Sequence, residues 1–254
     1  MYIYPRSIVT NEKAAFSLGR EATGEKILLV KGEASGFETR GQAEDGAWVC
    51  PLSPANAAAL RAYLPWLNPA PLGLRTSAGT GDRLGLATPG HARAALGAGI
   101  ALIFAQQSVR ENARTGRSPQ QVLDDALWGL FQEGWREPWG ADADHLKREQ
   151  DALPFIEAGY TFYTVDPGEH VGGAAPDETL DALRARAVGL DVPRLRADYL
   201  GRGFNLDGLE LSYDEPALLR AALKYHNAAA HAASLFYFIR ESNSSVYPDL
   251  STPV

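Results

Sequence analysis

The chain has 254 residues, of which 45% are hydrophobic and 22% are charged, a composition typical of a globular protein that buries one large core or two small ones. Its formal net charge is −7 and no basic stripe stands out, which argues against nucleic-acid binding. A single cysteine excludes an intramolecular disulfide and a cysteine-rich zinc site, and no run approaches about 20 apolar residues, so we expect a soluble cytoplasmic protein without a membrane span.

Residues 1–69 predict a small α+β region. Two strands and one helix are expected there, at residues 26–33, 47–52 and 53–67. Ser53 suits the N-cap of this helix, and Pro54 suits its first turn. The two prolines and the glycine of residues 67–73 predict a linker to the rest of the chain.

From about residue 70, predicted strands and helices alternate. The expected strands are residues 72–77, 100–106, 140–147 and 160–166. The expected helices between them are residues 88–99, 118–135 and 148–159. The helix at 118–135 has the clearest signal, because Ser118 caps it, Pro119 opens it and apolar residues recur at helical spacing. This alternation predicts an α/β fold with βαβ units and about four parallel strands.

The order weakens after the fourth strand. Residues 179–189 predict a short helix, residues 189–215 an irregular insertion and residues 215–241 a long helix. The expected organisation is therefore a small N-terminal region at 1–69, a partial (βα) barrel at 70–241 and an irregular tail at 242–254.

A polar segment follows each strand of the expected parallel sheet. The four segments are residues 79–83, 106–112, 142–145 and 166–170, with the polar loop after the first strand running from 78 to 85 and that after the second from 107 to 117. Because the carboxyl ends of parallel strands share one face, and that face carries the chemistry in such folds, we expect these segments to lie together.

The first two segments contain candidates for substrate binding. Asp82 and Arg83 suit a hydroxylated anion, or else they pack within a tight turn. Gln107 and Arg110 are candidates in a dense polar cluster that also contains Gln106, Glu111 and Asn112. Two amides and a guanidinium in succession suit the recognition of sugar hydroxyls and a carboxylate. Helix capping and loop hydrogen bonds are the alternative for this cluster.

The last two segments hold histidines. His145 follows Asp142 and Asp144, and it either contacts substrate or is a hydrogen-bonded structural histidine. In the segment Asp166–His170 a strand ends in a Pro-Gly turn, where Glu169 suits an acid/base role and His170 suits a divalent metal, with Asp166 a substrate contact. The alternative is an exposed turn. We set aside the remaining histidines, which lie on predicted helices: His91, His226 and His231.

Four blocks of sequence, in order, resemble the tagaturonate epimerase family (tagaturonate/fructuronate epimerases). The blocks are residues 79–94, 103–135, 140–147 and 159–171. The resemblance implies a TIM-barrel-like isomerase of hexuronate catabolism that uses a divalent metal cation to interconvert two keto-hexuronates. It also implies that His170 is a metal ligand and that Glu169 stands where the family carries a catalytic carboxylate, usually an Asp.

The inverted carbon of such a substrate is β to the ketone, so its C–H bond is not acidic enough for simple deprotonation. A retro-aldol route would instead need a Lewis acid on oxygen and a carboxylate that moves the hydroxyl proton. The sequence leaves this route and a proton-transfer route open.

Members of the family are about twice as long, and their later half carries further metal histidines and a second catalytic carboxylate. A closed barrel needs eight strands, so we expect a truncated or frameshifted member that acts only if a homo-oligomer or a second chain completes the barrel. The alternative is a non-catalytic carbohydrate-binding fragment of the same fold.

Overall fold

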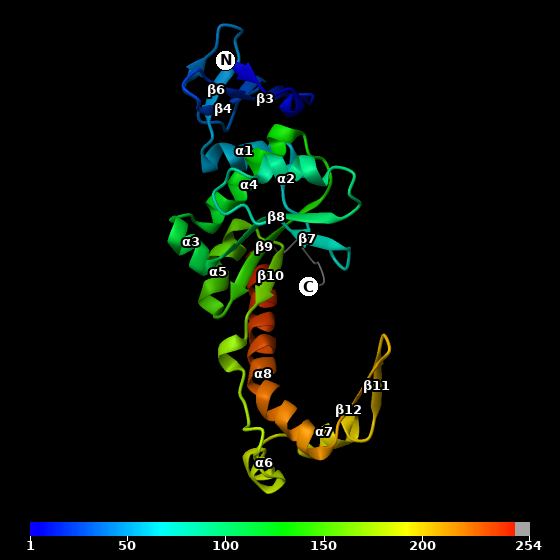
Figure 1. Ribbon diagram of the computed structural model, residues 1–254. Coiled ribbons are helices and arrows are strands. Elements are labelled where there is room, and N and C mark those ends of the chain that lie inside the picture. Colours follow the sequence, from blue (N-terminus) through cyan, green and yellow to red (C-terminus); the bar gives the residue numbers. More distant parts are fainter. Residues whose placement is uncertain (247–254) are drawn as a thin grey trace. The chain divides into compact units, whose positions relative to one another are not determined.

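The computed structural model describes residues 1–246 (Figure 1). The chain forms two compact units, one made of Met1–Thr164 with Ser242–Val254 and the other of Val165–Glu241. The boundary expected after residue 69 lies inside the first unit. The expected division into domains stays a prediction, and each unit is described by itself below.

The first unit begins with an antiparallel sheet. Its strands are β1 (Tyr2–Ile3), β2 (Val9–Thr10), β3 (Ala14–Arg20), β4 (Lys26–Gly32), β5 (Gly41–Gln42) and β6 (Trp48–Pro51), with the 3-10 turn η1 (Pro5–Ser7) between β1 and β2. The strand order is β1-β3-β4-β6-β5, and β2 pairs with β3. The strands expected at 26–33 and 47–52 are confirmed as β4 and β6.

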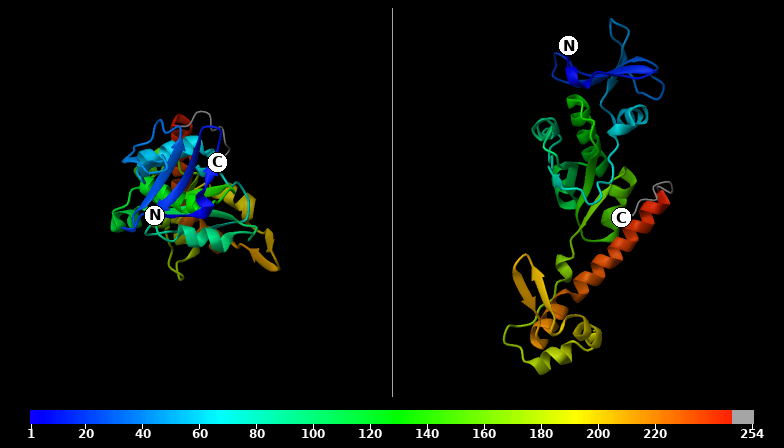
Figure 2. Two further views of the ribbon diagram at one scale, coloured as in Figure 1. Left: turned by 90° about the horizontal axis from the view of Figure 1, so that it is seen from above. Right: turned by 90° about the vertical axis from the view of Figure 1, so that its right-hand side faces the viewer.

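This sheet shares a hydrophobic core with two helices. They are α1 (Pro54–Tyr63), which is followed by the turn η2 (Pro65–Leu67), and α4 (Pro119–Glu133). Ser53 caps α1 as expected, because its side chain accepts the Asn56 N–H. Phe16 of β3, Leu60 of α1 and Phe131 of α4 belong to one buried cluster. The N-terminal region therefore packs on the helices of the parallel sheet (Figure 2).

The parallel sheet follows. Its strands are β7 (Ser77–Gly79), β8 (Ala101–Ser108), β9 (Trp139–Leu146) and β10 (Phe162–Val165), in the order β10-β9-β8-β7. The connecting helices are α2 (Thr88–Ala95), α4 and α5 (Glu149–Ala158), and α5 ends at Gly159 in the left-handed conformation. Four strands that curl into part of a barrel confirm the expected α/β, partial TIM-barrel-like fold.

Two expectations for this sheet were wrong in detail. The first strand covers Ser77–Gly79 instead of 72–77. The segment expected as a loop at 107–117 contains the helix α3 (Val109–Thr115). The reason is a capping box, in which the Ser108 side chain accepts the Glu111 N–H and the Glu111 carboxylate accepts the Ser108 N–H. Such reciprocal bonds satisfy the first amides of a helix and start it inside a polar segment.

The second unit is built from short elements and one long helix. They are η3 (Gly168–His170), α6 (Leu180–Arg186), α7 (Val192–Tyr199), β11 (Gly203–Leu206), β12 (Leu209–Ser212) and α8 (Glu215–Val246), of which the last turns of α8 belong to the first unit. Leu183 and Ala187 pack with Leu219 in its core.

The prediction of an irregular insertion at 189–215 was wrong, because these residues form α7 and an antiparallel hairpin. Asp207 and Gly208 have φ of 49° and 91°, as a two-residue hairpin turn requires. The long helix runs past the expected end at 241 to Val246, and the rest of the expected tail lies outside the described residues. Within residues 1–246, no helix combines the length and the apolar composition needed to cross a membrane.

Candidate functional site

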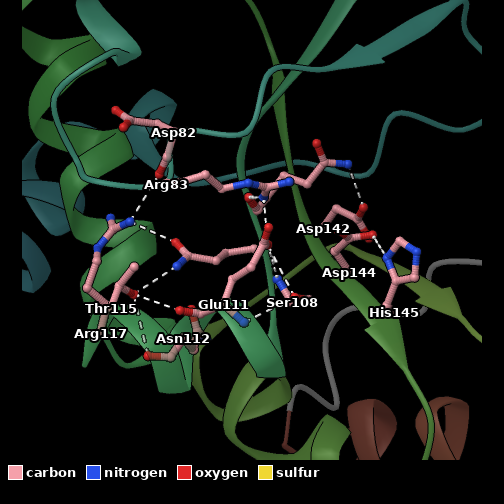
Figure 3. A network of polar contacts seen from close by, with 12 residues as sticks. Asp82, Arg83, Ser108, Glu111, Asn112, Thr115, Arg117, Asp142, Asp144 and His145 are labelled. Atoms are coloured by element: carbon pink, nitrogen blue, oxygen red, sulfur yellow. Dashed lines mark hydrogen bonds and ion pairs between the residues drawn. The ribbon is translucent and has the colours of Figure 1, made fainter.

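The carboxyl ends of β8 and β9 bring polar side chains together in the first unit (Figure 3). The two strands pair in parallel, but the register shifts by one residue between Ile103 and Ala105, so Gln106 lies opposite Asp142. Because side chains alternate along a strand, Gln106 and Gln107 face opposite sides of the sheet. The register shift therefore decides which of the two amides meets the carboxylate of β9.

Asp142 joins three strands of the sheet. Its side chain is buried, with a residue exposure of 1%. Gln106 Nε2 donates to Asp142 Oδ2 at 2.9 Å, and Thr164 Oγ1 of β10 donates to Oδ1 at 3.0 Å. Burial raises the pKa of the Asp142 carboxyl, and the nearby charge of Asp144 acts in the same direction, against the two hydrogen bonds.

A second carboxylate of β9 holds a histidine. Asp144 Oδ1 lies 2.6 Å from His145 Nδ1, while the imidazole itself is mostly exposed. His145 also has a φ of 56°, in the left-handed region that few histidines adopt. Backbone strain of this kind concentrates at functional sites. Because Asp144 engages Nδ1, the ring nitrogen that a ligand would meet is Nε2.

Arg83 and Glu111 form an ion pair beside this cluster. Arg83 Nη1 lies 3.2 Å from Glu111 Oε2 and also donates to the backbone carbonyl of Gln106. Partial burial acts to raise the pKa of Glu111, but hydrogen bonds from Ser108 and the charge of Arg83 outweigh it and hold the pKa below its usual value. Arg83 is thus tied to β8 and to α3 at once.

Asp82 organises the loop that carries Arg83. It is buried, with an exposure of 6%. Its carboxylate accepts the backbone N–H groups of Leu84, Leu86, Ala87 and Thr88. Burial acts to raise the pKa of Asp82, but these bonds lower it below its usual value. The carboxylate of Asp82 therefore accepts its hydrogen bonds from the loop itself. A contact between Asp82 and substrate stays a prediction.

The two candidates of the second polar segment, Gln107 and Arg110, lie apart from Asp142. Gln107 is fully buried, donates to Thr115 Oγ1 at 3.0 Å and accepts from Arg117 Nη1 at 2.7 Å. It therefore braces α3 from the opposite side of the sheet. Arg110 is exposed on the first turn of α3. Their roles in substrate binding stay predictions.

Asp166, Glu169 and His170 belong to the second unit. Asp166 Oδ1 accepts the Gly168 N–H at 2.9 Å and so shapes the turn η3 that carries the other two. The His170 ring stacks on the ring of His231 from α8, with centroids 3.9 Å apart and planes 22° from parallel. His231, which the sequence led us to set aside, is thus the histidine that meets His170.

Comparison with known proteins identifies the fold that carries this arrangement. The family model described as tagaturonate epimerase (UxaE) matches residues 4–251. The chain belongs to the tagaturonate epimerase family.

The relatives are longer than this chain. The tagaturonate/fructuronate epimerase of Thermotoga maritima is 40% identical over 244 residues, which cover 94% of this chain and 50% of the relative. The native crystal structure of fructuronate-tagaturonate epimerase from Cohnella laeviribosi matches with a TM-score of 0.85 at 34% identity, over 95% of this chain and 50% of that one. A complex of the Cohnella enzyme with one glycerol gives a TM-score of 0.86 at 33% identity and the same coverage. The chain spans about half the length of the tagaturonate epimerases it matches.

The described residues do not by themselves supply enough ligands for a catalytic metal ion. Such sites use about three protein ligands, and among residues 1–246 no group of three or more His, Cys, Asp or Glu side chains is arranged to hold one ion. The lone pairs of an imidazole lie in the ring plane, so the nearly parallel rings of His170 and His231 do not aim at a common ion. A divalent metal on His170 stays a prediction.

Sequence reasoning did not predict the contacts of three residues in this polar cluster. Gln106 and Glu111 belong to the predicted polar cluster and Asp142 lies near His145 in the sequence, but the candidates chosen from these segments were Gln107, Arg110 and His145. The spacing of Ser108 and Glu111 signals a capping box and could have shown a helix there. The pairing of Gln106 with Asp142 had no signal in the sequence, because it depends on the register of two strands.

Proposed function

We propose that this chain serves in the interconversion of tagaturonate and fructuronate, as part of hexuronate catabolism. The observation that carries the proposal is 40% identity over 244 residues to a tagaturonate/fructuronate epimerase. The matched region includes every strand of the parallel sheet and the polar side chains at its carboxyl end. The cytoplasmic location also stays a prediction.

The polar groups of the first unit suit the recognition of a hydroxylated acid. Arg83 carries a guanidinium at the rim of the sheet, and its side chain is 40% exposed. His145 presents an exposed imidazole whose Nδ1 is engaged by Asp144, an arrangement that can exchange a proton with a substrate hydroxyl through Nε2. Glu169 remains the predicted catalytic carboxylate of the second unit.

We further propose that another polypeptide segment completes the site, either a second copy of this chain or a separate chain. Two observations support this. The matched relatives are about twice as long. Within the described sheet, β7 and β10 are the two end strands, each paired on one side. An unpaired strand edge offers N–H and C=O groups to a further strand, and a further segment would also have to supply the metal ligands that residues 1–246 do not gather.

An activity assay tests this function. Purified chain is incubated with tagaturonate and a divalent metal, alone and after mixing with the separately expressed later half of the Thermotoga maritima epimerase. We expect fructuronate to form when the two parts are mixed, in a reaction that a chelator abolishes. A folded sample that forms no fructuronate in either case and binds no metal would remove the enzymatic proposal for this chain.

A second candidate is a non-catalytic carbohydrate-binding protein of the same fold. It is favoured because the polar rim of the first unit is held by its own hydrogen bonds, whereas residues 1–246 do not gather three ligands for a metal. Calorimetry with tagaturonate separates the two candidates. Binding without turnover in every mixture would support the second one.

A further inference from the structure

We propose that Gln106 recognises a hydroxyl group of the bound sugar acid by a hydrogen bond, with its side-chain amide held by Asp142 and packed against Gly79. This inference deepens the proposed function and rests on it. It identifies which of the two amides in the predicted polar cluster determines specificity, and how that amide is held. Three observations carry it: how the amide is held, what the amide leaves unbonded, and why β7 has a glycine beside it.

The amide is held by a carboxylate that is itself fixed. Gln106 Nε2 donates to Asp142 Oδ2 at 2.9 Å, and the Thr164 hydroxyl donates to both carboxylate oxygens at 3.0 Å and 3.1 Å. In this bond the amide nitrogen is the donor and the carboxylate oxygen the acceptor, so Asp142 holds the NH2 side of the amide. Asp142 is therefore a positioning residue, which sets the direction in which Gln106 presents its carbonyl oxygen.

The carbonyl oxygen of Gln106 is left for a ligand. Within residues 1–246 no protein donor reaches Oε1, and this oxygen is not among the enclosed polar atoms without a partner. Gln106 is half-buried at the carboxyl end of β8, where Arg83 donates to its backbone carbonyl. An oriented amide oxygen that reaches solvent beside a guanidinium suits a ligand that has both hydroxyl and carboxylate groups.

Gly79 of β7 provides the space in which the amide lies. A Cβ atom at position 79 would lie 2.6 Å from Cδ of Gln106 and closer still to the two terminal atoms of the amide. Gly79 is not one of the positive-φ glycines, so its backbone would accept alanine. The glycine is thus required by the neighbouring amide and not by the strand. The end of a glutamine side chain can move aside, so alanine there should displace the amide at little cost to folding.

The chain offers a matched control for this substitution. Gly90 of α2 also lies outside the positive-φ set, and a Cβ there would meet no atom within 4 Å. Gly79→Ala and Gly90→Ala therefore make the same chemical change in the same unit, but only the first displaces Gln106. Gln106→Ala is a third variant, which removes the amide without crowding the strand.

Two measurements on the full-length variants test the proposal. Side-chain amide resonances of glutamine, assigned to Gln106 by their loss in Gln106→Ala, report whether the amide is held. Calorimetry reports the dissociation constant for tagaturonate. We expect Gly90→Ala to match the wild type in both. We expect Gly79→Ala to shift the Gln106 resonances and to weaken binding by about tenfold, and Gln106→Ala to weaken binding by at least as much.

Each contrary result identifies what fails. Unchanged Gln106 resonances in Gly79→Ala would overturn the seating of the amide. Displaced resonances with unchanged affinity in Gly79→Ala, or wild-type affinity in Gln106→Ala, would overturn the reading role while leaving the proposed function intact. A wild-type chain that binds no tagaturonate, alone or mixed with the later half of the Thermotoga maritima epimerase, would reject both this role and the proposed function.

Discussion

The polar rim of β8 and β9 and the turn Asp166–His170 differ in how their side chains are held. At the rim, carboxylates, amides and hydroxyls from three strands and a helix bond to one another, with Asp142 and Asp82 buried. In the turn, no residue of η3 is buried, and His170 rests on one ring from α8. The polar rim is therefore preorganised by its own hydrogen bonds, whereas the predicted catalytic pair of the second unit lies on an exposed turn.

The largest expected contrast is between Asp82 and Asp166, the carboxylates that shape the two loops. Asp82→Ala leaves the N–H groups of Leu86, Ala87 and the buried Thr88 without their acceptor where α2 begins, and should lower the free energy of unfolding by on the order of 3 kcal/mol. Asp166→Ala, in a partly exposed turn, should cost less than about 1 kcal/mol. Urea denaturation at neutral pH measures both. Equal losses of unfolding free energy in the two variants would contradict this contrast.

A smaller contrast lies within the rim, between two buried carboxylates with opposite pKa shifts. The pKa of Asp82 is lowered, so its stabilising contribution is present above the usual value of 3.8 and is lost as the pH falls toward the lowered pKa. The pKa of Asp142 is raised, so its ionisation costs stability as the pH rises from 3.8 through the raised pKa.

We therefore expect Asp142→Asn to unfold with a free energy at neutral pH equal to that of the wild type or higher by on the order of 1 kcal/mol. Asp82→Asn should instead be less stable than the wild type at neutral pH, and its deficit should shrink in acid. Urea titrations at several pH values between 3 and 7, which bracket the usual aspartate pKa, measure how the stability difference between each variant and the wild type changes with pH. If the two stability differences changed in the same direction with pH, the opposite pKa shifts of Asp82 and Asp142 would be contradicted.

The smallest expected effect concerns the stacked histidines of the second unit. A double-mutant cycle with His170→Ala and His231→Ala should give a coupling of about 0.5 kcal/mol in the free energy of unfolding, because a stacked ring pair with one exposed member adds little beyond its area. A coupling of several kcal/mol would mean that the turn is held as firmly as the rim.

Much of the fold followed from local signals. The strand β8 and the helix α4 were predicted because apolar runs and caps such as Ser118 are written in neighbouring residues. The helix α3 and the hairpin β11–β12 also have local signals in the sequence, a capping box and an Asp-Gly pair.

The core of the site could not be predicted in the same way. The choice between Gln106 and Gln107 depends on one extra residue in β8, between Ile103 and Ala105, which changes the face that every later side chain takes. The contact of His170 with His231 depends on how η3 packs on a helix about sixty residues away. Both are tertiary facts that propensity and spacing do not contain.

The most direct test of the account is the titration of tagaturonate into the purified chain, with divalent metal and again after its removal by a chelator. The rim of the first unit is held by its own hydrogen bonds, and its side chains form no three-ligand group among the described residues. The account predicts that tagaturonate binds in both conditions and that Gln106→Ala weakens the binding in both. Binding that vanishes with the metal, or that is indifferent to Gln106, would contradict it.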